Sequence, residues 1–210
     1  MKPTGKLHQL DARDRINRAR PMQTCPTGIP ALDELLPGSG WPRAGLVEVL
    51  VSHECIDAMA LFMPILARLS RQERWLAMVT PPFPSRCRLF TDSRIDPERV
   101  LQVNPHPGRS GLWTVESMLR SGGCSVVAGW PGCTTDLMGR RLQRAAAIGR
   151  ALGVLIRQER QSGYVSGADI RLKLTAGTNG QPVYLLNGHG DVVAGTVLQC
   201  LRDAETGPGF

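Results

Sequence analysis

The sequence predicts an α/β fold, with a mostly parallel sheet, helices on both faces and an antiparallel hairpin at one edge. Short β-branched apolar runs alternate with longer segments of helical spacing, and short connections join them. Near the C-terminus, two runs of alternating or β-branched residues flank an Asn-Gly pair, which is typical of a hairpin. Strands that alternate with helices favour parallel βαβ units, and the hairpin is expected to extend their sheet.

Each element follows from a local pattern. A first helix is expected over 29–36, capped by Thr27 and ended by a Pro-Gly pair. Residues 46–51 are apolar and β-branched, which indicates a buried strand. Apolar spacing predicts a helix over 56–69 with a kink at Pro64. The remaining expected elements are strands over 75–79, 100–103, 125–128, 154–156, 169–175 and 183–186, and helices over 86–93, 112–121 and 134–151.

Composition bounds the class of protein. With 210 residues, 42% of them hydrophobic and 20% charged, the chain has the make-up of a soluble globular protein. We expect a basic flexible arm over 1–24, one α/β domain over 25–190 and a C-terminal tail over 191–210. A net charge of +7 predicts weak, non-specific attraction to single-stranded DNA.

The cysteines and the N-terminus indicate the compartment. None of the six cysteines forms a CxxC pair, and no Cys/His set has zinc-ligand spacing. The first residues contain no apolar run of the kind that a signal peptide has. We therefore expect a cytoplasmic protein with reduced thiols, no contact with membranes, no metal and no cofactor.

The segment TGIPALDELLPGSGWPR, residues 27–43, resembles the part of RecA-type ATPases that leads into the first core strand. That strand should end in a phosphate-binding loop of the form GxxxxGK[ST]. Here Val51 and Ile56 stand at the two glycines, Asp57 at the lysine and Ala58 at the hydroxyl. A carboxylate would repel phosphates, and no hydroxyl remains to hold Mg²⁺. The resemblance thus implies a RecA-like fold with a degenerate phosphate loop and no enzymatic activity.

Several segments in matching order resemble the ImuA family, RecA-like bacterial proteins related to the SulA cell-division inhibitors. They are the 27–43 segment, GLVEVLV, LFMPILARLSRQERWLAMVTPP, DPERVLQV and GRRLQRAAAIGRALGVLIR. The leading TGIPALDELLP and the hairpin over 169–186 are features of the longer ImuA proteins, and they favour ImuA over SulA.

The resemblance implies a non-catalytic accessory role in the SOS response to DNA damage, supporting error-prone translesion synthesis. The implied partners are an ImuB-type polymerase-like protein, RecA or an error-prone polymerase. The alternative is a SulA-like inhibitor that binds the tubulin-like division protein FtsZ and blocks its polymerisation. Residues 187–191, NGHGD, depart from the more basic sequence of relatives, which argues against a nucleic-acid role for that segment.

Two groups of residues are candidates for partner or nucleic-acid contact. Arg140, Arg141 and Arg144 lie on one side of the expected helix, where they could bind phosphates or an acidic partner or simply face solvent. Trp130 and Phe83 follow expected strands at the edge where such sheets bind ligands, and could form an apolar rim there. No nucleophile or metal set accompanies the residues at the phosphate-loop position, so no catalytic residue is expected.

Overall fold

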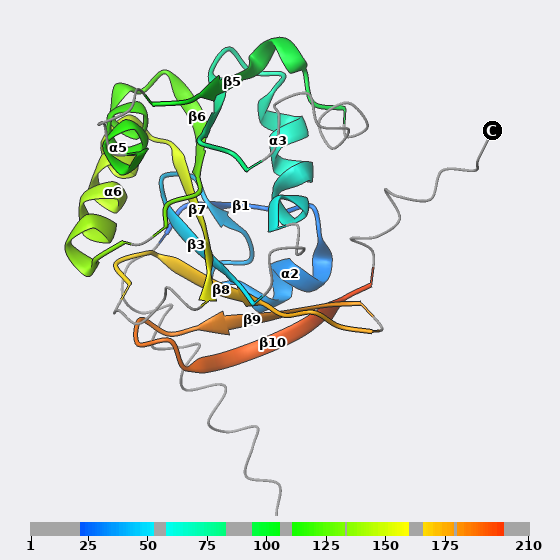
Figure 1. The fold of residues 1–210 in the computed structure, drawn as a ribbon. Helices are drawn as coiled ribbons and strands as arrows, with labels where there is room; N and C mark the ends of the chain where they lie inside the picture. Colours follow the sequence, from blue (N-terminus) through cyan, green and yellow to red (C-terminus); the bar gives the residue numbers. More distant parts are fainter. Residues whose placement is uncertain are drawn as a thin grey trace, which may run out of the picture.

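An eight-stranded mixed sheet forms the centre of the molecule (Figure 1). The structure, a computed structural model, describes residues 22–52, 58–82, 94–105, 111–132, 134–159, 166–178 and 180–199. The strand order is β10-β9-β8-β3-β7-β6-β4-β5, and the six strands from β8 to β5 are parallel, whereas β9 and β10 run antiparallel. The strands are β3 (Gly45–Val51), β4 (Trp75–Val79), β5 (Val100–Val103), β6 (Cys124–Gly129), β7 (Leu152–Gln158), β8 (Ile170–Leu174), β9 (Gln181–Leu186) and β10 (Val192–Leu198). The expected mostly parallel sheet with a C-terminal antiparallel hairpin is confirmed.

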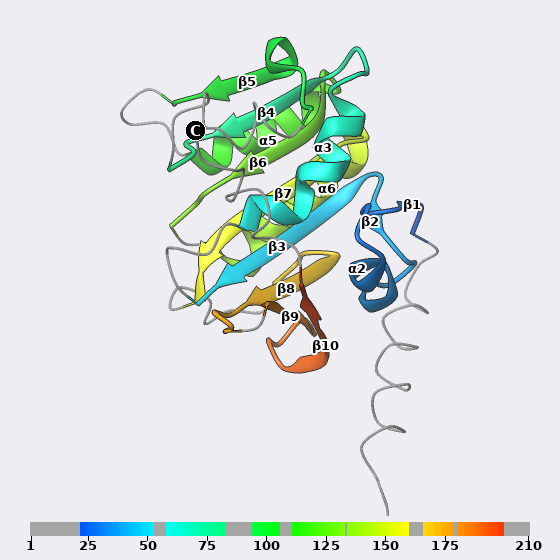
Figure 2. The same cartoon turned by 90° about the vertical axis from the view of Figure 1, so that its right-hand side faces the viewer.

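Helices cover both faces of the sheet, and Figures 1 and 2 show α5 and α6 on the face opposite α3. The helical segments are α2 (Pro30–Leu35), η1 (Ala58–Phe62), α3 (Met63–Leu69), η2 (Pro97–Arg99), α5 (Gly111–Ser121) and α6 (Asp136–Gly149). A small antiparallel pair, β1 (Thr24–Cys25) with β2 (Trp41–Pro42), precedes β3. None of the helices in the described residues is long and apolar enough to cross a membrane.

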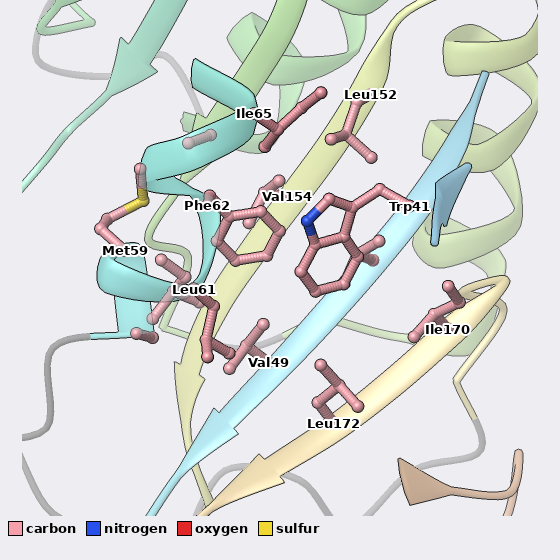
Figure 3. Close-up of a cluster of buried hydrophobic side chains, with 14 of the residues drawn as sticks. Trp41, Val49, Met59, Leu61, Phe62, Ile65, Leu152, Val154, Ile170 and Leu172 are labelled. Atoms are coloured by element: carbon pink, nitrogen blue, oxygen red, sulfur yellow. The ribbon is translucent and has the colours of Figure 1, made fainter. Parts of the chain in front are cut away.

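Two apolar clusters hold the layers together. On the α3 face, the rings of Trp41 and Phe62 stack with their centroids 4.5 Å apart (Figure 3). Strand residues such as Val49 and Val154 complete this cluster. On the other face, α5 and α6 pack a second cluster against the same sheet. Because both faces are covered, every residue of β3 is buried, which explains its continuous apolar run.

The helix expected over 56–69 is interrupted. Residues 58–62 form the 3₁₀ helix η1, and α3 begins only at Met63. Pro64 lies in the first turn of α3, where its missing N–H costs no helical hydrogen bond, so the chain starts a new helix there and has no kink within one. Residues 56 and 57 lie outside the described residues.

Thr27 does not cap the first helix, as the sequence pattern suggested. The N-cap residue is Ile29, which makes no side-chain capping bond. The Thr27 hydroxyl instead accepts a hydrogen bond from the Ile29 N–H at 3.0 Å, and the Thr27 N–H donates to the Asp33 carboxylate at 2.7 Å. The carboxylate of the helix thereby fixes the chain that leads into it.

The expected C-terminal tail over 191–210 contains a strand, which is a correction. Residues 192–198 form β10 and pair with β9 along its whole length, with a bulge between Val192 and Ala194. The expected arm over 1–24, apart from its last residues, and the expected helix over 86–93 lie outside the described residues.

Candidate interaction surface

Helix α6 presents a stripe of apolar and basic side chains to solvent. Leu137, Arg141, Arg144 and Ile148 follow one another at spacings of three or four residues, which places them on one side of the helix. Leu137 is 68% exposed and Ile148 54% exposed. The opposite side of α6 is buried and consists of Gly139, Leu142, Ala145, Ala146 and Gly149. The expected division into a basic outer side and a small apolar inner side is therefore present.

Two of the three candidate arginines have acidic partners. Arg140 binds Asp136 one turn earlier at 3.0 Å, and Arg141 binds Glu116 of α5 at 2.7 Å. Glu116 also accepts from Arg120 at 3.1 Å. Arg144 is exposed and has no ion pair or hydrogen bond to any residue in the described ranges. Arg144 is therefore the arginine of the stripe whose charge is most available to an acidic partner.

A buried ion network fixes the N-terminal end of α6. Glu48 of β3 pairs with Arg157 of β7 at 2.7 Å and with Arg171 of β8 at 2.8 Å, on side chains at most 4% exposed. Arg157 also donates to the Thr134 hydroxyl at 2.5 Å, and the next residue, Thr135, caps α6 by accepting from the Met138 N–H. The network thus links three strands to the first turn of the helix.

Two further contacts hold α6 along its length. In its middle, Gln143 donates to Asp169 at 2.6 Å, and the other oxygen of Asp169 accepts from the Leu46 N–H at 2.8 Å. At its end, the Arg74 guanidinium donates to the carbonyl oxygens of Gly149 and Arg150 at 2.7 and 2.8 Å. Cations at helix C-termini are favourable because the carbonyls there lack helical partners. The stripe is therefore carried on a rigid helix.

The second candidate group is only partly described. Trp130 follows β6, is half-buried and packs against the cluster on the α3 face, so it does not share a surface with the arginines of α6. Phe83 lies outside the described residues, so the apolar rim remains a prediction. Residues 53–57 also lie outside them, and the degenerate phosphate loop and the RecA-type assignment remain predictions as well.

Sequence reasoning missed the apolar members of the stripe. Leu137 and Ile148 occupy positions in helical phase with Arg141 and Arg144, and this phase was the available signal. It also missed the charges of the buried network. A glutamate within GLVEVLV and an arginine within LGVLIRQ are unusual in strands covered on both faces, and they indicate partners on adjacent strands.

Comparison with known proteins identifies the family. The family described as "Cell division inhibitor SulA" matches residues 45–153, which is more than half of the chain. The chain belongs to the SulA family. The matched region runs from β3 to the start of β7 and includes α6 with its stripe, whereas α2 and strands β8 to β10 lie outside it.

Individual relatives carry the same description. "Cell division inhibitor SulA" of Serratia marcescens is 30% identical over 131 residues, which span 62% of this chain and 78% of that protein. The protein of that name from Serratia proteamaculans is 31% identical over the same shares. One from Salmonella paratyphi B is 34% identical over 122 residues, covering 56% and 71%. The crystal structure of SulA from Pseudomonas aeruginosa aligns with 53% of this chain and 97% of that chain, with a TM-score of 0.43 and 24% identity.

These matches correct the main functional expectation. The expected role in translesion synthesis rested on a preference for ImuA over SulA, and the matching family and relatives are SulA proteins. The added segments that favoured ImuA are present, but they lie outside the matched region.

Proposed function

We propose that this protein is a non-catalytic, cytoplasmic inhibitor of cell division that acts in the response to DNA damage by binding FtsZ. The observation that supports the proposal is membership of the SulA family, whose relatives are described as cell division inhibitors. An inhibitor of this kind acts by occupying a protein surface. It therefore needs a firm recognition surface and no reactive group.

The α6 stripe has the properties that such a surface requires. The helix is fixed at its N-terminal end, its middle and its C-terminal end, so little side-chain and backbone order is lost when a partner binds. Its outer side combines exposed apolar area at Leu137 and Ile148 with the charge of Arg144. Apolar anchors supply affinity, and an available positive charge favours an acidic partner surface. We propose this stripe as the contact with FtsZ.

Binding of purified FtsZ to the immobilised full-length chain tests both parts of the proposal. The wild-type protein should bind. Arg144→Glu and Leu137→Glu should each weaken binding by at least about tenfold, which corresponds to about 1.4 kcal/mol. Both positions are exposed, so circular dichroism and melting should show little change in the free proteins.

Arg71→Glu is the matched control, because Arg71 is an exposed arginine in the turn after α3 and undergoes the same change of charge. It should bind FtsZ as the wild type does. Wild-type binding that both α6 variants leave unchanged would move the contact elsewhere and leave the function standing. No binding by the wild-type chain would contradict the function itself.

A further inference from the structure

Strand β10 forms one edge of the sheet and is unusually open. It is seven residues long, Val-Val-Ala-Gly-Thr-Val-Leu, and contains no charge and no proline. Helix α2 packs against one of its faces, and β9 pairs with one of its edges. Natural proteins usually block such edges with lysine, proline, a bulge or a very short strand. Here the bulge lies at the first residues only and leaves 194–198 regular.

The register shows which backbone groups face outward. Val197 lies opposite Pro182 of β9, which has no N–H, and the Pro182 carbonyl accepts from the Thr175 N–H on the β8 side at 3.3 Å. In an antiparallel ladder, residues alternate between bonding the neighbour and facing away from it. The N–H and C=O of Val197, and those of Gly195 two residues earlier, therefore point away from β9.

The side chains of β10 suit pairing with an identical strand. When two copies run antiparallel so that Gly195 of each lies opposite Val197 of the other, Thr196 lies opposite its own copy and Ala194 lies opposite Leu198. Small residues then face large ones, and the threonines form a favourable pair. Val197 is 48% exposed, so this contact also removes apolar surface from water.

Charge favours a second copy as the occupant. The chain carries a net charge of +7, so two copies repel each other over most of their surfaces. The uncharged β10 edge allows close approach without placing like charges opposite each other. A twofold contact of this type is self-complementary and closed, so association stops at two chains.

We propose that two copies of this protein pair through β10, joining their sheets into one continuous sheet across a twofold axis. The contact lies outside the region matched by the SulA family and is independent of the α6 stripe. A dimer of this form presents two α6 stripes, so one particle can engage two partner molecules.

Sedimentation equilibrium of the full-length chain over a wide concentration range tests the proposal. The wild-type mass should rise with concentration to twice the 22.8 kDa of one chain. Over the same range, hydrogen exchange at the Gly195 and Val197 amides should slow. A single-chain mass at every concentration would overturn the proposal.

Two substitutions at one position identify the surface. Val197→Pro removes an N–H that β9 does not use, so the fold should persist while the outward donor is lost. Val197→Thr keeps the N–H and nearly the same shape. The proline variant should sediment as a single chain and the threonine variant as a dimer. If circular dichroism shows that the proline variant does not fold, Val197→Lys, which places a charge on the edge, replaces it. Dimerisation that persists in the folded proline variant or its lysine replacement would overturn the proposal.

Discussion

Glu48→Gln tests the buried network that positions α6. The substitution keeps the shape of the side chain but removes the negative charge that Arg157 and Arg171 share at 2.7 and 2.8 Å. It leaves two guanidinium groups, each at most 4% exposed, beside a neutral amide. Breaking a buried ion pair by removing one partner costs about 3–5 kcal/mol, because the remaining charge is no longer compensated.

That cost is a large fraction of the stability of an ordinary domain, about 5–15 kcal/mol. For a chain of this size, about 2–4 °C of melting temperature are lost per kcal/mol, so Glu48→Gln should melt about 6–20 °C lower. Replacing the whole network with Glu48→Leu, Arg157→Met and Arg171→Met should restore most of the loss, since no buried charge remains.

Urea unfolding followed by circular dichroism measures these differences. Asp136→Asn is the matched control, because it removes the acid from an exposed pair with Arg140. Exposed pairs contribute at most about 1 kcal/mol. A loss for Glu48→Gln no larger than that of Asp136→Asn would refute the argument that the network is a buried, charge-balanced anchor.

Three other predictions concern the ends of α6 and the thiol beneath it. Gly149→Ala should strongly destabilise the protein in the same unfolding assay, because an added Cβ would lie 1.8 Å from the Leu119 carbonyl oxygen of α5. Stabilisation by this change would refute the close packing of α5 on α6. Arg150→Gly should raise stability by up to about 1 kcal/mol, because Arg150 caps α6 in the left-handed region with φ of 51°, whereas its carbonyl contact with Arg74 belongs to the backbone and remains. A lower stability would show that the arginine side chain matters more than its backbone strain. Burial raises the pKa of the Cys124 thiol above its usual 9.0. The folded protein therefore keeps this proton to higher pH than the unfolded chain, so its contribution is complete below about pH 9 and declines above it. Cys124→Ala should flatten the alkaline fall of stability, and an unchanged slope in pH-dependent unfolding would contradict this assignment.

The sequence pattern located most elements because burial on both faces leaves a plain signal. Strand β4 begins and ends at the expected residues, and α5 begins one residue earlier than expected. Strand β10 was missed because Ala194 and Gly195 interrupt any alternation and weaken strand propensity. Its place is fixed by pairing with β9 and by the cover of α2, which are tertiary effects.

The candidate surface was predictable in part for a similar reason. Helical phase alone placed the three arginines on one outer side of α6. It did not show that Glu116, on a different helix, neutralises Arg141 and leaves Arg144 available. Glu48, Arg157 and Arg171 are brought together only by the order of β7, β3 and β8 in the sheet. The family match, in turn, decided between two functions that the local motifs left open.

Polymerisation of purified FtsZ, measured by sedimentation in the presence of increasing amounts of this protein, tests the central claim most directly. An inhibitor of cell division that binds FtsZ should reduce the pelleted polymer in a dose-dependent manner, and the Arg144→Glu protein should require a higher concentration for the same effect. An unchanged amount of polymer at an excess of the folded wild-type protein would contradict the proposed function.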